Sequence, residues 1–272
     1  MELADLHVDT PLNDAPVINA ASLAEFESLI INFAFCFLKP ISLASMSKTI
    51  SVFQKDVPGM HPHLFPIYSI EGLGEFDNVE DVLYLIDEYD MSVVSLSWNK
   101  DSLFGGGCFG AEAGGLTSMG DALLNELGKR NTVVDISHAS PKLADDILRD
   151  YSRVIATHSN AYHIMPHERN LRDGLIRHTA LSGGLIGVNF YRKFIAENGT
   201  LSDLLRHIEH IIAVAGENCI ALGSDLDGMD DGVISEPSGF KGLYDAVVKG
   251  FSESIAKKLF FENVKKYFAI SI

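Results

Sequence analysis

Residues 132–159 constrain the fold most, because they have the pattern of a strand, a helix and a second strand. Two short apolar runs with β-branched residues, 132–136 and 153–157, enclose a segment with helical spacing at 141–150. Ser140 is placed to cap that helix at its N-terminus. A connection of this length predicts a right-handed βαβ unit, in which the two strands are parallel.

Each strand of this unit is followed by a histidine, His138 after the first and His158 after the second. Because the strands are parallel neighbours, both histidines should emerge at the same C-terminal edge of the sheet. Two imidazoles side by side at that edge suggest a metal site. Two buried core histidines are the alternative that this unit alone leaves open.

Composition excludes several classes of function. The 272 residues carry a formal net charge of −16, and so acidic a surface repels a phosphate backbone, which argues against nucleic acid as a partner. The three cysteines are odd in number and widely spaced, as in a reduced cytosolic protein. The N-terminus lacks the pattern of a signal peptide, and the longest apolar run, 29–38, is too short for a membrane span. We expect a cytoplasmic protein that contacts no membrane.

The rest of the chain repeats the alternation of strand and helix. Eight apolar strands are predicted at residues 3–9, 32–38, 65–70, 91–98, 132–136, 153–157, 184–191 and 219–225. The helices between and after them are predicted at residues 22–31, 42–55, 78–88, 118–129, 141–150, 174–181, 201–215, 239–249 and 252–268. A Gly-rich loop at 105–115 is long enough to be a lid over a site.

Eight such units predict a closed (β/α)₈ TIM barrel that forms a single domain over residues 1–272. A doubly wound open sheet is the alternative fold. That fold would be expected to carry a Gly-rich nucleotide turn after its first strand, and residues 7–11 contain no glycine.

Polar side chains that can bind metal stand at the C-terminal ends of several predicted strands. His7 and Asp9 are two apart on the first strand, so both can face one ion, although a buried His–Asp hydrogen bond is the alternative. Glu71 ends the third strand and Asp225 ends the eighth. With the two histidines of the opening unit, these residues should converge at one mouth of the barrel.

Three imidazoles and three carboxylates are too many for one tetrahedral site. They suit two ions roughly 3.5–4 Å apart with a bridging carboxylate, which together activate a bridging hydroxide and clamp the carbonyl oxygen that it attacks. Zinc fits this mixed nitrogen and oxygen set best, with manganese and cobalt as alternatives. A carboxylate that binds no metal can move protons, and Asp225 is the natural candidate.

At this point the chain resembles the renal (membrane) dipeptidase family of the amidohydrolase superfamily, and in particular its bacterial-type members. The resemblance spans nearly the whole chain, in the family's order. It rests on the motifs Asp5-Leu6-His7-Val8-Asp9-Thr10, Ser69-Ile70-Glu71-Gly72, Asp135-Ile136-Ser137-His138-Ala139-Ser140, Thr157-His158-Ser159-Asn160-Ala161-Tyr162, Arg169-Asn170-Leu171 and Gly223-Ser224-Asp225-Leu226-Asp227-Gly228, with a weaker echo in Val188-Asn189-Phe190-Tyr191.

The resemblance implies a metal-dependent (β/α)₈ barrel and a role for each matching residue. One zinc would be bound by His7, Asp9 and Glu71, and the second by the bridging Glu71 together with His138 and His158. The substrate's terminal carboxylate would be held by Arg169 in the motif that also contains Asn170, since a planar guanidinium suits a carboxylate. Asp225 would accept the proton of water and deliver it to the leaving amine.

Trp98 departs from the family pattern. Many members have a histidine in this motif, which contacts the scissile carbonyl oxygen, whereas the motif here is Leu96-Ser97-Trp98-Asn99. An indole ring can pack on a substrate, but it cannot donate charge to an oxyanion as a protonated histidine can. Either the two metals suffice without that histidine, or substrate choice and rate differ here from those of relatives.

The leading hypothesis is a binuclear zinc dipeptidase that hydrolyses the peptide bond of dipeptides. The alternatives are a related amidohydrolase acting on N-acyl amino acids, lactones or cyclic amides, and a non-enzymatic descendant that binds peptides. Barrels of this kind often dimerise, so a homodimer stays open beside a monomer. Finally, His207 and His210 are expected to be exposed residues on the helix at 201–215.

Overall fold

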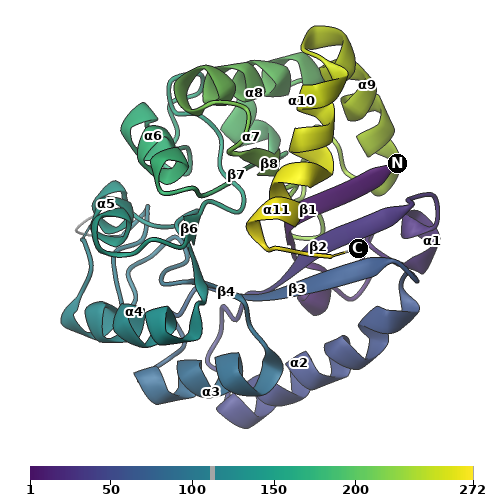
Figure 1. Ribbon diagram of the computed structural model, residues 1–272. Helices are drawn as coiled ribbons and strands as arrows, with labels where there is room; N and C mark the ends of the chain where they lie inside the picture. Colours follow the sequence, from purple (N-terminus) through teal and green to yellow (C-terminus); the bar gives the residue numbers. More distant parts are fainter. Residues whose placement is uncertain (111–113, 272) are drawn as a thin grey trace.

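A computed structural model describes residues 1–110 and 114–271 of the chain, and within them eight parallel strands form one sheet. The order of the strands is β6-β5-β4-β3-β2-β1-β8-β7. They are β1 (Glu2–Val8), β2 (Ser28–Phe35), β3 (Leu64–Glu71), β4 (Val93–Ser95), β5 (Val133–Asp135), β6 (Val154–Ile155), β7 (Ile186–Val188) and β8 (Ile220–Leu222). A parallel bridge between Ala156 and Ile186 joins the two edges, so the sheet closes into a barrel (Figure 1). The predicted (β/α)₈ barrel is confirmed.

The helices lie outside the barrel (Figure 1). They are α1 (Ala20–Leu23), α2 (Leu43–Asp56), α3 (Val79–Tyr89), α4 (Ser118–Arg130), α5 (Pro141–Asp150), α6 (Asp173–Leu181), α7 (Arg192–Ile195), α8 (Leu201–Ala215), α9 (Phe240–Gly250), α10 (Glu253–Lys257) and α11 (Asn263–Tyr267). Helices α5 and α8 begin and end where the sequence predicts, and the side chain of Ser140 accepts the backbone N–H of Leu143 as an N-cap. Short 3₁₀ turns η1 (Thr10–Leu12), η2 (Val57–Gly59) and η3 (Pro237–Gly239) complete these connections.

The predicted helix at residues 22–31 is wrong. Only Ala20–Leu23 is helical, and strand β2 already begins at Ser28. Residues Leu29, Ile30 and Ile31 pair in register with both β1 and β3. Burial between two neighbouring strands decides the structure of this apolar run, because pairing there satisfies backbone groups and side chains together.

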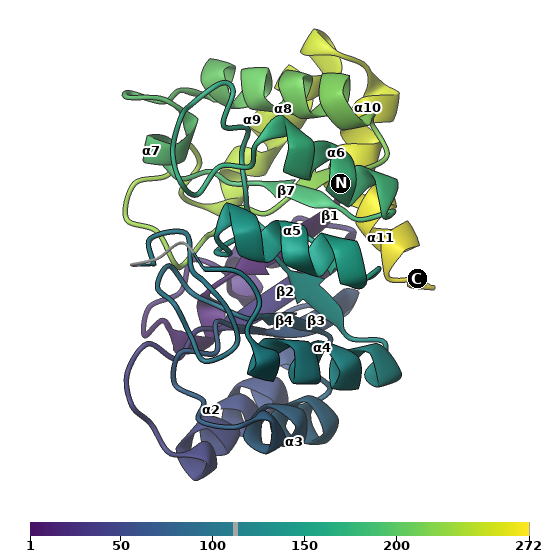
Figure 2. The same cartoon turned by 90° about the vertical axis from the view of Figure 1, so that its left-hand side faces the viewer.

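The C-terminal segment closes one end of the barrel. Helix α10 continues through a π-helical turn, η4 (Lys258–Glu262), into α11, where the sequence predicts one uninterrupted helix. Phe261, Val264 and Ile270 from this segment join the inner core, which is otherwise formed by residues that point into the barrel from its strands. In Figure 2 the C-terminus lies at one end of the molecule, and α7 and the long loops extend at the other.

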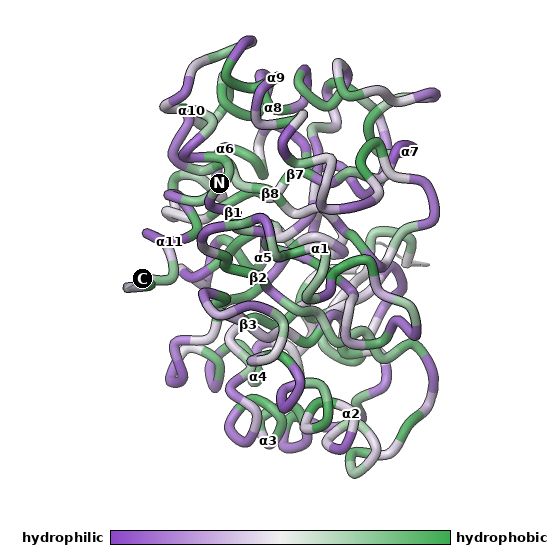
Figure 3. The backbone as a smooth tube through the Cα atoms, turned by 90° about the vertical axis from the view of Figure 1, so that its right-hand side faces the viewer, coloured by the Kyte–Doolittle hydropathy of each residue, from purple (hydrophilic) through white to green (hydrophobic). Residues whose placement is uncertain are grey.

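The barrel interior has an apolar lower part and a polar upper part. Val93, Val133 and Ile155 from β4, β5 and β6 belong to the inner apolar core. Two residues further along each strand, the same face carries Ser95, Asp135 and Thr157, all buried. Figure 3 shows hydrophobic residues concentrated on the central strands and hydrophilic ones mainly on outer turns. The polar layer lies directly below the mouth where the long loops gather.

The Gly-rich loop at 105–115 is described only in part, because residues 111–113 lie outside the described residues. Its first half is hydrogen-bonded to neighbouring segments, with Cys108 N–H donating to the carbonyl of His138 at 3.0 Å and Phe109 N–H to that of Asn99 at 2.7 Å. Among the residues that the structure describes, no helix combines the length and apolar character needed to cross a bilayer.

Candidate metal centre

The residues predicted as metal ligands come together at the C-terminal mouth of the barrel. His7 lies near the end of β1 with Asp9 just after it, and Glu71 is the last residue of β3. His138 and His158 follow β5 and β6 on short turns. Parallel strands bring these positions to one rim although the residues are up to 151 positions apart in sequence.

One oxygen of Glu71 is the centre of the cluster. Its Oε1 lies 2.8 Å from Nε2 of His138, 3.4 Å from Nε2 of His7 and 3.4 Å from Nε2 of His158. On the other side of His7, Nε2 lies 3.5 Å from Oδ2 of Asp9. All three rings therefore present the same nitrogen to one carboxylate.

This donor set fits metal ions. Nε2 of His7 is buried and has no hydrogen-bond partner among the described residues. Nε2 of His138 and Nε2 of His158 lie only 2.9 Å apart, close enough for both nitrogens to face one ion. Two overlapping trios satisfy the spacing of ligand atoms around an ion, and they are His7–Asp9–Glu71 and Glu71–His138–His158. Imidazole nitrogen with carboxylate oxygen is a set that zinc accepts.

Burial and mutual charge shift the pKa values of these groups. Burial acts to lower the pKa of His7, but the carboxylates of Glu71 and Asp9 outweigh it and raise that pKa to about 10. Burial lowers the pKa of His138 and of His158 well below the usual value, and the neighbouring cations Arg169 and His7 lower it further. His138 and His158 are thus kept neutral, which is the form that binds metal.

Asp225 lies beside the first trio, just after β8. Burial and the carboxylates of Asp9 and Glu71 raise its pKa to about 7. Its Oδ2 accepts a hydrogen bond of 2.9 Å from Nδ2 of Asn189. Its backbone is left-handed, with φ of 64°, and its N–H donates to the carbonyl of His7 at 3.0 Å. The side chain is therefore held from two sides.

Two glycines at the barrel mouth leave room for neighbouring side chains, Gly72 for Trp98 and Gly228 for the Asp9 carboxylate. Gly72, directly after Glu71, has φ of +81°, and a Cβ there would lie 2.5 Å from Cβ of Trp98. A Cβ on Gly228 would overlap Oδ2 of Asp9. Glycine at these two positions lets the carboxylates and the Trp98 ring share the barrel mouth.

A cleft of about 810 Å³ opens above the cluster. Its floor includes Glu71, His138, His158, Asp9 and Asp225. Arg169 and Trp98 line its walls, together with Phe109, Phe194 and Tyr191. The cleft is therefore large enough for a small molecule and combines polar groups on the floor with aromatic walls.

Arg169 is buried at the edge of the cleft, with 3% of its surface exposed. Its Nη1 donates to the carbonyl oxygen of Ser137, and its Nη2 lies 3.0 Å from Nε2 of His138. Its guanidinium also lies over the ring of Phe194, 5.5 Å from the centroid. These contacts fix the guanidinium cation next to the Glu71–His138–His158 trio.

Trp98 and Asn99 both contact His138. The Trp98 ring stacks on the imidazole with centroids 5.5 Å apart, and Nδ1 of His138 lies 2.9 Å from Oδ1 of Asn99. Asn99 has φ of 58°, a conformation that asparagine tolerates better than most residues.

Asn170 lies beside the cleft and does not line it. Its Nδ2 donates to the carbonyls of Met165 and Phe194, at 2.9 and 2.8 Å. The amide thus holds the loop that carries Arg169, and this placement separates Asn170 from the other predicted substrate-binding residues.

Sequence reasoning missed several groups at this site. Cys36, just after β2, lines the cleft, and burial together with the nearby carboxylate of Glu71 raises the pKa of its thiol. Asn99 and Asn189 belong to the motifs Leu96-Ser97-Trp98-Asn99 and Val188-Asn189-Phe190-Tyr191, but no role was predicted for either. Asn189 directly follows β7, and Asn99 lies four residues after the end of β4.

The expectation for His207 is wrong. His207 is fully buried: its Nδ1 accepts the backbone N–H of Ala161 at 3.1 Å, and its Nε2 lies 2.9 Å from the carbonyl of Ile195. His210, one turn later on α8, is partly exposed and pairs with Asp173. The side of α8 that contains His207 packs inward, because the segment after β6 covers it.

A family model described as membrane dipeptidase, peptidase family M19, matches residues 55–270. The chain is 36% identical over 186 residues to an uncharacterised dipeptidase of Schizosaccharomyces pombe, covering 65% of this chain and 43% of that protein. It is also 32% identical over 209 residues to an uncharacterised protein in the pqqA 5′ region of Klebsiella pneumoniae, covering 71% of this chain and 77% of that protein. The chain thus spans less than half the length of the fission-yeast relative.

Solved structures share the fold. The crystal structure of dipeptidase AC, a metallopeptidase of family M19, has a TM-score of 0.84 at 24% identity, covering 98% of this chain and 97% of that one. A metallopeptidase from Rhodobacter sphaeroides, liganded with a phosphinate mimic of L-Ala-D-Ala, has a TM-score of 0.83 at 22% identity, covering 99% of both chains. With the family model matching well over half of its length, this chain belongs to the membrane dipeptidase family of metallopeptidases, peptidase family M19.

Proposed function

We propose that this protein is a binuclear zinc dipeptidase. The observation that carries the proposal is the convergence of three imidazole nitrogens, all within 3.4 Å of one Glu71 oxygen, on the floor of a cleft that also holds a buried arginine. Membership of the membrane dipeptidase family supports the same activity.

In this proposal, His7, Asp9 and Glu71 hold one ion, and Glu71, His138 and His158 hold the other. When bound, the two ions lower the pKa of the attacking water and polarise the scissile carbonyl. Glu71 serves both sites because its Oε1 faces all three rings. Manganese or cobalt would suit the same donors.

Arg169 is proposed to bind the terminal carboxylate of the dipeptide. Its contact with the carbonyl of Ser137 fixes one edge of the guanidinium, and the side chain lines the cleft. A fixed planar cation beside the metal trio limits how far the scissile bond can lie from the carboxylate, which favours short peptides with a free C-terminus.

Asp225 is proposed to take the proton of the attacking water and to give it to the leaving amine. Asn189 holds its Oδ2, and the side chain lines the cleft together with Asp9. A carboxylate held in this way can transfer a proton without first being reoriented.

The structural neighbour from Rhodobacter sphaeroides contains a phosphinate mimic of L-Ala-D-Ala, a small dipeptide. By analogy of fold, the first substrates to test are dipeptides with small side chains, in both L,L and L,D forms. The cleft of about 810 Å³ holds a molecule of this size.

The decisive experiment combines metal analysis with hydrolysis of a dipeptide panel. Purified protein is expected to hold close to two zinc ions per chain and to hydrolyse dipeptides. Asp225→Asn is expected to keep its metal while losing turnover by a factor of about 10²–10⁴. Dipeptide hydrolysis that persists after complete removal of metal would contradict the proposal.

Trp98 favours one alternative, an amidohydrolase that acts on N-acyl amino acids. The ring stacks on His138 and lines the cleft, so an apolar acyl group could pack against it. N-acyl amino acids, lactones and cyclic amides are included in the same panel. A dipeptidase should hydrolyse free dipeptides faster than these compounds, and the alternative predicts the reverse.

A further inference from the structure

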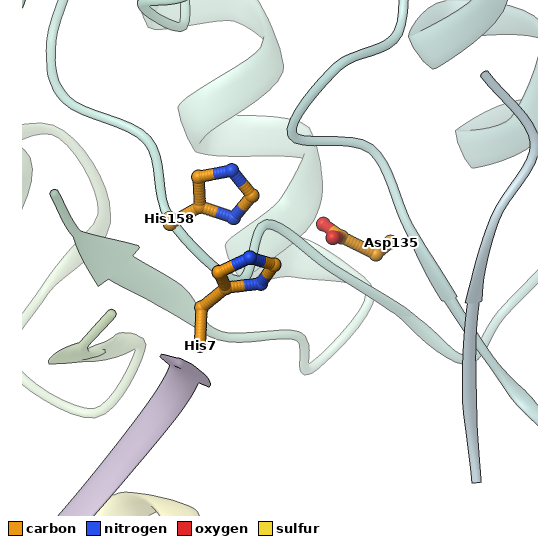
Figure 4. A group of neighbouring side chains, drawn as sticks. All are labelled: His7, Asp135 and His158. Carbon is orange, nitrogen blue, oxygen red and sulfur yellow. The ribbon is translucent and has the colours of Figure 1, made fainter. Parts of the chain in front are cut away.

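Below the two candidate metal trios, the Thr157 hydroxyl and the Asp135 carboxylate connect two of the histidines. Figure 4 shows His7 and His158 side by side with the carboxylate of Asp135 next to them. The two rings come from different trios, and their centroids lie 3.7 Å apart. The Thr157 hydroxyl lies 2.8 Å from Nδ1 of His158, 3.3 Å from Nδ1 of His7 and 2.6 Å from Oδ2 of Asp135.

The carboxylate of Asp135 is already committed to hydrogen bonds. Its Oδ1 accepts the N–H and hydroxyl of Ser137 and the N–H of Thr157, at 2.9, 2.7 and 2.9 Å. Its Oδ2 accepts the hydroxyl of Thr157 and, at 3.5 Å, that of Ser95. Asp135, His7 and His158 also have metal-ligand spacing, but binding an ion there would break several of these bonds.

The Thr157 hydroxyl has one proton and two lone pairs. Because a carboxylate can only accept, the proton points to Asp135, at the shortest of the contacts made by this oxygen. The lone pairs are then left for the imidazoles, so Nδ1 of each ring must carry a hydrogen. A neutral His158 ring protonated at Nδ1 has its free lone pair on Nε2, which is the atom of that ring that faces Glu71.

We propose that Thr157, oriented by Asp135, is a positioning residue that sets the Nδ1–H tautomer of His158 and holds the same nitrogen of His7, so that one hydroxyl aims a ligand of each zinc. This inference rests on the proposed function for the role of the two rings, but the tautomer itself is a property of the metal-free protein. Both residues act below the cleft and touch neither substrate nor reacting atoms.

The first test reads the tautomer directly. In metal-free protein labelled with ¹⁵N-histidine, with the His158 signals assigned by comparison with His158→Gln, we expect a protonated Nδ1 and a bare Nε2. The isosteric variant Thr157→Val removes only the hydroxyl, and it should shift His158 toward the Nε2–H tautomer. Thr157→Ser restores the hydroxyl and should restore the wild-type spectrum.

A second variant should invert the arrangement. In Asp135→Asn the oxygen can still accept at the Oδ1 position, and the amide nitrogen at the Oδ2 position donates to Thr157. The threonine proton then turns toward His158, whose Nδ1 must accept it, so the ring should be protonated at Nε2. His158 should thus be an Nε2–H tautomer in Asp135→Asn, whereas Thr157→Val only removes the preference for Nδ1–H. A purely structural role of Thr157 would not produce this pair of results.

The third measurement is zinc affinity by competition with a chelator. Loss of a partner that orients a metal-binding histidine raises the dissociation constant by a factor of about 10–100, and we expect this for Thr157→Val but not for Thr157→Ser. Thr179→Val is the matched control, because Thr179 is also fully buried and its hydroxyl has no partner among the described residues. It should leave zinc affinity unchanged.

The outcomes separate the two proposals. Wild-type ¹⁵N signals and zinc affinity in a folded Thr157→Val protein would overturn the positioning role. If the wild type shows the expected tautomer but binds no zinc or cleaves no dipeptide, the tautomer assignment stands and the proposed function fails.

Discussion

Asp5 illustrates the energetic cost of the polar layer at the level of a single residue. Its Oδ1 accepts the backbone N–H groups of His7 and Ser224, at 3.1 and 2.9 Å, and so joins β1 to the turn after β8. Its Oδ2 is buried with no hydrogen-bond partner in the described part of the chain. Burial raises the pKa of this carboxyl to about 6. The charge is thus kept at a cost, in exchange for fixing the backbone next to His7.

Asp5→Asn should remove that cost. With a pKa of about 6 in the folded state against 3.8 in the reference state, the folded protein binds the proton more tightly, so its stability falls as the pH rises from about 4 to 6. Relative to the wild type, the free energy of unfolding of Asp5→Asn should rise by about 2 kcal/mol between pH 4 and pH 7. Denaturant titrations of metal-free protein across this range measure it, and a pH-independent difference would contradict the assignment.

Arg169→Lys should weaken recognition of the substrate carboxylate. A lysine keeps the charge but loses the planar fork, and a hydrogen bond to a charged group contributes about 1.5–3 kcal/mol. KM for dipeptides should rise by about 10–100-fold, and the preference for a free over an amidated C-terminus should fall. Zinc content serves as the check on folding, and an unchanged preference for the free carboxylate would remove Arg169 from substrate binding.

At the scale of elements, helix α8 stabilises the segment that carries Arg169. His207 links this helix to Ala161 in that segment and to Ile195 at the end of α7, so three elements meet at one buried imidazole. Asn170 adds bonds from the same segment to Met165 and Phe194. These partners lie outside the barrel, on the side of the loop away from the cleft. The side of the loop that carries Arg169 therefore faces the cleft.

His207→Ala should destabilise the protein by about 2–3 kcal/mol, because it leaves two buried backbone groups without partners. His210→Ala on the same helix is the control: its ion pair with Asp173 is partly exposed, and its loss should cost at most about 1 kcal/mol. Denaturant unfolding at pH 7.5 compares the two. Equal losses would show that the His207 contacts carry no special weight.

The pH dependence of the same residue has a definite sign. Burial lowers the pKa of His207 to about 4, so the unfolded chain takes up the proton first and stability should be lost as the pH falls from about 6.5 toward 4. The difference in unfolding free energy between the wild type and His207→Ala should therefore shrink over this range. A difference that stays constant would mean that His207 binds the proton equally well in the folded and unfolded states.

At the scale of the whole molecule, the two ends of the barrel do different work. The C-terminal segment closes one end with apolar side chains, and the cleft with the candidate metal-binding residues occupies the other. In Figure 2 the loops and the C-terminus lie on opposite sides accordingly. Packing at the closed end should therefore contribute to stability without touching the chemistry.

Phe261→Ala tests this division. The ring is buried among residues of the inner core, and truncating a buried phenylalanine costs about 3–5 kcal/mol. KM for dipeptides and zinc affinity should stay close to wild type. Phe65→Ala, at a partly exposed ring on β3, is the control and should cost less than about 1 kcal/mol. A large change in KM for Phe261→Ala would show that the two ends are coupled.

The sequence by itself determined the order of strands and helices and most of the cluster at the mouth. Glu71, His138 and His158 could be placed at the barrel mouth, because residues at the C-terminal ends of parallel strands lie along the same edge of the sheet. Strand ends could not place Arg169, because it lies on a long segment without periodicity. Its position at the site was expected only from the family resemblance. Local patterns therefore predicted what lies at the end of a strand.

Only the tertiary structure decided which neighbours these residues would have. Residues 28–31 became strand because β1 and β3 flank them, and His207 became buried because a distant segment covers α8. The contact of Thr157 with His7 joins residues 150 positions apart. No local pattern encodes such contacts, because a side chain's partners depend on barrel closure, which brings β1, β5 and β6 to one layer.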